Sequence, residues 1–200
     1  MTTTSRILTG TAALLLIILF AVPLWHIRLQ APQYPEGLGL QIRVGTVTGA
    51  NPNDLDNINE LNHYIGMKRI DPSAIPVLAA MPWAVGVLAA AGLLVALVGR
   101  RRLLELWFVG FCVVALVGLG ELWWWEYDYG HHIDVAHAII KVPGMTYQPP
   151  FIGSKQLLNF TATSWPALGG WIAALALALA LCAIVGARQG RRFGFRAGHA

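Results

Sequence analysis

The sequence predicts an all-α membrane protein with four transmembrane helices and a small α+β cap on the outer side of the membrane. Two observations lead to this fold class. Of the 200 residues, 56% are apolar and only 12% are charged, and the mean hydropathy is +0.57. Four runs are almost free of charge and long enough to cross a bilayer, which takes about 20 apolar residues in a helix. These runs are residues 7–25, 76–99, 103–125 and 165–187.

Basic side chains flank the ends of these runs and predict the topology. With four spans, three arginine clusters fall on the same side, which the positive-inside rule makes cytoplasmic. Both termini are then cytoplasmic, and the net charge of +4 reflects membrane orientation rather than a nucleic-acid partner. The clusters are Arg6, then Arg100, Arg101 and Arg102, then Arg188, Arg191, Arg192 and Arg196.

The chain divides into five parts in order. Residues 1–25 form the first transmembrane helix, a signal anchor because no small-residue cleavage site follows it. Residues 26–75 form an outer segment, and residues 76–125 form two transmembrane helices joined by a three-arginine turn. Residues 126–164 make a second long outer loop. Residues 165–200 supply the fourth transmembrane helix and a basic cytoplasmic tail.

The first outer segment carries two strand patterns. The stretch WHIRLQ alternates Trp25, Ile27 and Leu29 with polar residues, and GLQIRVGTV continues the alternation through Leu40 and Ile42. Period-two alternation is typical of a half-buried strand. The proline- and glycine-rich stretch between them predicts a turn, and so a short hairpin or a pair of extended segments.

The stretch NPNDLDNINELNHYIGM predicts an amphipathic helix that follows this hairpin. Gly66 marks its end, as glycine does for many helices. An apolar face, spaced by threes and fours, consists of Leu55, Ile58, Leu61 and Ile65. The opposite face is a polar stripe made of Asp56, Asn59, Glu60 and His63, which Met67 joins if the helix, or a turn after Gly66, brings its thioether to this face.

This polar stripe contains the candidate metal ligands. An imidazole and a thioether together suit copper, particularly its reduced ion, so His63 and Met67 are the first candidates. The alternative is an ordinary surface pair between His63 and Glu60. The outer segments offer further candidate ligands in His131, His132, His137 and Met81. Haem is not expected, because no histidine lies in the central part of a span.

A second candidate site lies at the outer end of the third run. Glu121 precedes the tryptophans Trp123, Trp124 and Trp125, which are typical of an interfacial belt. Together they could line a pocket for a quinone or a lipid headgroup. The chain has no phosphate-binding loop, nucleophile elbow or basic-aromatic platform, which predicts a protein that is not an enzyme and binds no nucleic acid.

Three stretches carry a resemblance to known proteins: APQYPEGLGLQI, NDLDNINELNHYIGMKRIDP and IPVLAAMPW. Across residues 24–83 the chain resembles a family of small polytopic bacterial inner-membrane proteins associated with copper accessory factors of nitrous-oxide reductase. The resemblance implies an accessory role in periplasmic copper handling or maturation of a copper oxidoreductase. The rival function is a structural subunit of a larger respiratory or photosynthetic complex, in contact with lipids and other membrane or periplasmic proteins.

Overall fold

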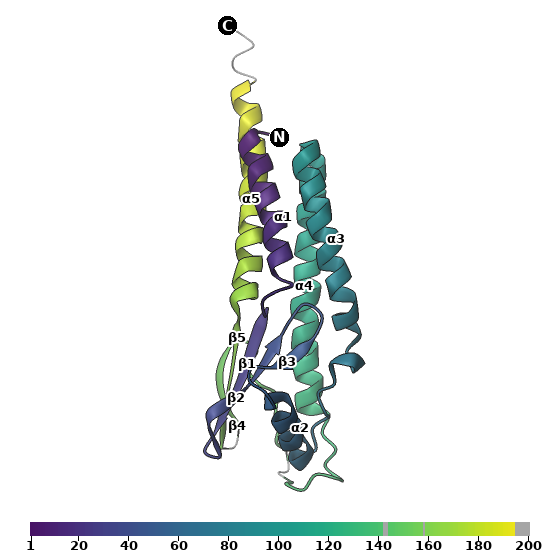
Figure 1. The fold of residues 1–200 in the computed structure, drawn as a ribbon, viewed down its shortest axis with the longest axis vertical. Helices are drawn as coiled ribbons and strands as arrows, with labels where there is room; N and C mark the ends of the chain where they lie inside the picture. The colour runs from purple at the N-terminus through teal and green to yellow at the C-terminus, as the bar shows by residue number, and fades with distance from the viewer. Residues whose placement is uncertain (142–143, 158, 195–200) are drawn as a thin grey trace.

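The computed structural model describes residues 1–141, 144–157 and 159–194 as a mixed α+β protein with a helical bundle above a single sheet (Figure 1). The helices are α1 (Thr3–Ile18), α2 (Asp54–Ile65), α3 (Pro76–Val98), α4 (Arg101–His131) and α5 (Leu168–Gly194), with the short 3-10 helix η1 (Pro72–Ala74). The strands are β1 (Trp25–Ala31), β2 (Tyr34–Ile42), β3 (Val47–Gly49), β4 (Gly153–Leu157) and β5 (Phe160–Pro166).

The predicted all-α fold with four spans is wrong. Within the described residues, three helical segments are long and apolar enough to cross a membrane: Pro76–Val98, Arg101–His131 and Leu168–Arg188. The chain is therefore a membrane protein, but α1 has only 16 residues. At 1.5 Å per residue it spans about 24 Å, less than the roughly 30 Å hydrocarbon core.

The first apolar run is helical only in its first part, which explains the error. Helix α1 ends at Ile18, and β1 begins at Trp25. Between them lies Pro23, which has no backbone N–H and disfavours helical geometry in the residue before it. The chain turns over residues 19–24 although these residues are mostly apolar, so the length of the apolar run overstated the length of the helix.

The two outer segments combine into one antiparallel sheet with the strand order β3-β2-β1-β5-β4. The predicted hairpin is confirmed, because β1 pairs with β2 and Ile27 lies opposite Leu40. On its other side β1 pairs with β5, where Ile27 lies opposite Ser164. Strand β1 is therefore the central strand of the sheet, and its buried residues Trp25, Ile27 and Ala31 lie on one face of it.

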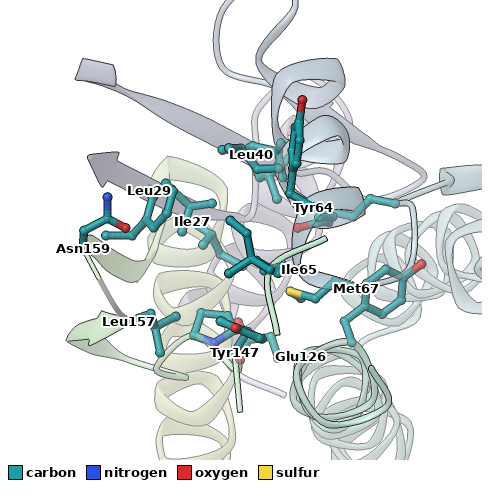
Figure 2. A pocket seen from close by; sticks show the side chains of 18 of the residues that line it. Ile27, Leu29, Leu40, Tyr64, Ile65, Met67, Glu126, Tyr147, Leu157 and Asn159 are labelled. Atoms are coloured by element: carbon teal, nitrogen blue, oxygen red, sulfur yellow. The ribbon is translucent and has the colours of Figure 1, made fainter. Parts of the chain in front are cut away.

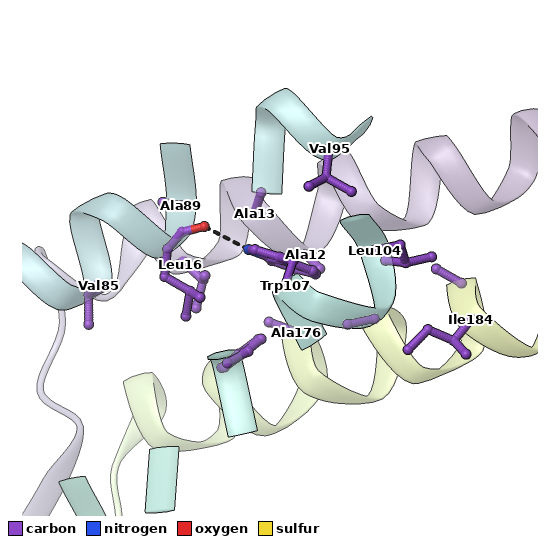
Figure 3. Packing of buried hydrophobic residues seen from close by; sticks show 14 of the residues in the cluster. Ala12, Ala13, Leu16, Val85, Ala89, Val95, Leu104, Trp107, Ala176 and Ile184 are labelled. Atoms are coloured by element: carbon purple, nitrogen blue, oxygen red, sulfur yellow. Dashed lines mark hydrogen bonds between the residues drawn. The ribbon is translucent and has the colours of Figure 1, made fainter. Parts of the chain in front are cut away.

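Small side chains let the helices of the bundle approach one another (Figure 3). Ala13 of α1 and Ala176 and Ala180 of α5 are fully buried in a shared core. Small residues at such interfaces allow close backbone packing in membrane bundles. Helices α3 and α4 are held together by Trp107, whose indole Nε1 donates a hydrogen bond to the carbonyl oxygen of Leu88 at 2.8 Å.

Arg6, Arg101 and Arg188, one from each basic cluster, lie at the same end of the bundle. Arg6 donates to two backbone carbonyls at the end of α3, at 2.6 and 2.8 Å. The carboxylate of Glu105 lies 2.9 Å from Arg101 and 3.6 Å from Arg188. Arg196 lies outside the described residues. The sheet occupies the opposite end of the molecule, so the basic end and the cap are separated by the length of the bundle (Figure 1).

Candidate ligand-binding site

Helix α4 continues beyond the membrane-spanning part and forms one wall of the cap. Its 31 residues extend about 46 Å, some 16 Å more than the hydrocarbon core requires. The last turns of α4 pack against the hydrophobic cluster that the sheet shares with α2. Four residues there are spaced i, i+3, i+4 and i+7 and share one face of the helix. They are Leu122, Trp125, Glu126 and Tyr129.

A cavity of about 300 Å³ lies between this face of α4, the inner face of the sheet and α2 (Figure 2). Most of its lining is apolar. The sheet contributes Ile27, Leu29 and Leu40, and α2 contributes Ile58, Leu61 and Ile65. The apolar face predicted for α2 therefore packs against the sheet and lines the cavity.

Buried polar side chains hold α2 in this position. The carboxylate of Asp54 is buried and accepts hydrogen bonds from the backbone N–H groups of Gly39 and Asn51, both at 3.0 Å. Asn59 is also buried: its amide accepts from the N–H of Ile70 at 2.7 Å and donates to the carbonyl of the same residue at 3.2 Å. The predicted polar stripe is therefore not a continuous free surface, because Asn59 belongs to the packing.

The end of α2 is fixed to the second outer segment. Gly66 ends the helix with a φ of +76°, and a side chain at this position would come within 2.5 Å of the carbonyl oxygen of Asp134. The carbonyl oxygen of Gly66 accepts from the N–H of Asp134 at 2.8 Å. That of Tyr64 accepts from the N–H groups of Ile139 and Ile140. The chain before and after α4 thus closes around the cavity.

Tyr147 reaches the cavity through a close backbone approach at Gly130. The N–H of Tyr147 donates to the carbonyl of Gly130 at 3.0 Å. A Cβ atom on Gly130 would lie 2.4 Å from the backbone of Gln148, so only glycine permits this contact. Tyr147 is consequently buried, and it lies beside Glu126 in the cavity (Figure 2).

Several buried polar atoms in this cavity have no hydrogen-bond partner within the described part of the chain. Within the described part of the chain, four buried side-chain atoms have no hydrogen-bond partner: Nε1 of Trp125, both carboxyl oxygens of Glu126 and the hydroxyl oxygen of Tyr147. All three residues line the cavity. Since buried polar groups in folded proteins are nearly always paired with protein or water, these atoms are available to bind a water molecule or a ligand in the cavity. We call them the polar end of the cavity.

Glu126 is the most unusual member of the polar end. Its side chain is 1% exposed. The nearby hydroxyl of Ser164 donates its hydrogen to the carbonyl of Phe151 at 3.1 Å and accepts from Nε1 of Trp25 at 2.8 Å. Burial raises the pKa of Glu126 to about 8, because the charged carboxylate loses its hydration. The carboxyl group is therefore mainly neutral at pH 7 and carries a hydrogen that it can donate.

The first candidate copper ligands lie on different sides of the cap. Met67 lines the cavity (Figure 2). His63 is exposed, and its ring contacts the neighbouring ring of Tyr64 at a centroid distance of 6.4 Å. The reason is the turn at Gly66, after which the N–H of Met67 donates back to the carbonyl of Asn62 at 2.8 Å. The thioether thus turns inward, away from the exposed imidazole.

The other candidate histidines each have a local partner. His132 lies 2.7 Å from Asp128, and His137 lies 2.7 Å from Asp134, whose pKa this contact lowers. His131 stacks on the ring of Tyr127 at 4.0 Å. Met81 belongs to the partly buried residues of the helical core. Among the residues described, no three His, Cys, Asp or Glu side chains form a group that could hold a metal ion, and the copper assignment stays a prediction.

The tryptophan cluster divides between the membrane side and the cavity. Trp123 and Trp124 are exposed and stack on Tyr127 at 5.6 and 6.0 Å, as suits an interfacial belt. Trp125 turns inward. Glu121 is exposed, so the carboxyl group that reaches the cavity is Glu126 instead.

The sequence does contain a signal for Glu126. The helical spacing places it on the same face as Trp125 and Tyr129, and a carboxyl group on an otherwise apolar and aromatic face is costly to bury.

No family model matches the chain, and no curated protein matches it either. The resemblance over residues 24–83 accordingly stays a prediction.

Proposed function

We propose that this protein is a non-enzymatic, membrane-anchored binding protein whose cap holds a small amphiphilic molecule taken from the membrane interface. The observation that carries this proposal is the polar end of the cavity. Every buried side-chain atom without a partner, among the residues that the structure describes, belongs to Trp125, Glu126 or Tyr147. An aliphatic lining with a few convergent polar groups is the usual composition of a small-molecule site.

The position of the cavity favours a ligand from the membrane. The inward-facing Trp125 directly follows two exposed tryptophans, so the cavity begins where the spanning part of α4 ends. The arginines at the other end support an orientation with that end in the cytoplasm, by the positive-inside rule. In this orientation both termini are cytoplasmic and the cap faces the periplasm of a bacterial inner membrane.

The test of this function uses protein purified from its own membrane in mild detergent. Organic extraction and mass spectrometry should detect one small molecule in near-stoichiometric amount. The Ile65→Trp variant fills part of the cavity and should lose this molecule, whereas Glu60→Trp on the exposed side of α2 should keep it. A wild-type protein that carries no such molecule, or one that both variants retain equally, would contradict the proposal.

Copper handling, the function predicted from the sequence, can be tested on the same preparation. Elemental analysis of the purified protein measures its copper content directly. That prediction requires bound copper which the double variant His63→Ala/Met67→Ala loses. An unchanged copper content in the double variant would remove both residues as ligands.

A further inference from the structure

We propose that the cavity takes a neutral molecule whose apolar body ends in a carbonyl group, and that the polar end of the cavity donates hydrogen bonds to this carbonyl. The inference rests on the proposed function, because it names the chemical class of the molecule that the cavity holds. It follows from the donors present, the charges absent and the volume.

Trp125 decides the direction of the hydrogen bonds. An indole N–H can only donate, so the ligand must offer an acceptor to this atom. The indole ring is held in place by the ring of Tyr129, at a centroid distance of 4.8 Å. The hydroxyl of Tyr147 can donate as well. Two buried donors without partners therefore face one cavity.

Glu126 completes a set of three donors. In its neutral form a carboxyl group donates one hydrogen bond, and an apolar environment favours that form. An ammonium ligand would instead require an ionised Glu126, and it would leave the N–H of Trp125 without an acceptor. A carbonyl oxygen has two lone pairs and accepts from two of these three donors, whereas a cation accepts from none, so a neutral carbonyl compound suits these groups better.

The charge of the lining excludes an acidic head group. The described residues that line the cavity include no Lys, Arg or His. A phosphate or carboxylate bound there would lie near Glu126 without a positive partner, and burial of an unpaired charge is strongly unfavourable. This leaves neutral acceptors such as quinones, esters and amides, which share the carbonyl group.

The volume limits the body of the ligand. A cavity of about 300 Å³ is at the small end of the range for ligand sites. It suits one ring or one short chain, not a complete lipid with two acyl chains. The aliphatic side chains of the sheet and α2 provide an apolar surface for such a body.

The experiment compares three probes of similar size, using the full chain in lipid nanodiscs and saturation-transfer NMR. Duroquinone carries two carbonyl groups, durene has the same methylated ring without them, and phenyltrimethylammonium is a cation. We expect duroquinone to bind about tenfold more tightly than durene, since hydrogen bonds to otherwise unpaired buried donors have about this effect. Protein-free nanodiscs correct for partition into lipid.

Two substitutions of Glu126 separate a carbonyl ligand from a cation. Glu126→Gln keeps an N–H donor, so duroquinone should bind within about threefold of wild type. Glu126→Leu removes the donor and should weaken binding about tenfold. Preference for phenyltrimethylammonium, with equal loss in both variants, would overturn the carbonyl assignment.

The same data distinguish a failure of this inference from a failure of the proposed function. Equal binding of durene and duroquinone that Ile65→Trp abolishes would overturn the carbonyl inference and leave the cavity as a ligand site. Binding of all probes that Ile65→Trp does not affect would overturn both.

Discussion

The burial of Glu126 predicts a pH dependence of stability that a single substitution removes. Burial raises the pKa of this carboxyl from 4.5 to about 8, so the folded protein retains a proton that the unfolded chain loses. The protonated Glu126 therefore contributes its full stabilisation below pH 4.5, and this contribution is lost as the pH rises toward 8.

The size of this pH effect on the free energy of unfolding is set by the difference between the pKa of Glu126 in the folded protein and in the unfolded chain. Between the two pKa values, each pH unit lowers the free energy of unfolding by at most about 1.4 kcal/mol relative to Glu126→Gln, which does not titrate. From about pH 5 to pH 7 the difference between the two proteins should change by up to roughly 3 kcal/mol in favour of the variant.

Chemical denaturation in mild detergent, followed by tryptophan fluorescence at several pH values, measures this difference. Glu121→Gln is the matched control, because Glu121 is five residues earlier on the same helix and exposed. It should reproduce the wild-type pH curve. If wild type and Glu126→Gln instead give parallel curves, Glu126 is charged in the folded protein or exposed to water, and the reasoning about the polar end is refuted.

Three further substitutions test the packing. Gly130→Ala brings a Cβ to 2.4 Å from the next loop and should cost about 1–3 kcal/mol, whereas Gly120→Ala, with nothing within 4 Å, should be neutral or stabilising; thermal unfolding compares them. Asn59→Ala leaves two buried backbone groups unpaired and should destabilise the cap by about 1–3 kcal/mol, seen as faster amide exchange in α2. Trp107→Phe loses one buried hydrogen bond and should lower stability by about 1 kcal/mol in the same thermal assay. Unchanged stability in any of the three destabilising variants would contradict the contact it tests.

Patterns of neighbouring residues correctly predicted α2 and the hairpin of β1 and β2. The periodicity of Leu55, Ile58, Leu61 and Ile65 located α2, and Gly66 located its end, because a left-handed residue after a helix favours glycine. The hairpin of β1 and β2 followed from alternation in the same way. These features arise from neighbours a few residues apart, which a sequence displays directly.

The error in α1 was local, but the other errors came from contacts between distant segments. Nothing near β1 indicates that it pairs with β5, about 135 residues later, so the sheet could not be assembled from local alternation. The prediction of a free polar stripe on α2 was wrong for the same reason, because Asn59 is buried against the chain at Ile70. Glu126 was overlooked because three consecutive tryptophans indicated a membrane interface, although helical spacing turns Trp125 inward.

The cavity itself depends on tertiary structure. It forms because α4 is longer than the bilayer requires and because Gly130 admits the loop that carries Tyr147. Neither feature predicts a cavity until α2 and both halves of the sheet are placed around it. The residue types were visible in the sequence, but their convergence was not.

An experimental structure of the protein, purified in mild detergent without removal of bound lipids, tests the central claim most directly. We expect density for a non-protein molecule in the cavity, with an acceptor atom about 2.7–3.2 Å from Nε1 of Trp125 or the hydroxyl of Tyr147. A cavity that holds only water, or one in which Trp125, Glu126 and Tyr147 pair with one another, would contradict it.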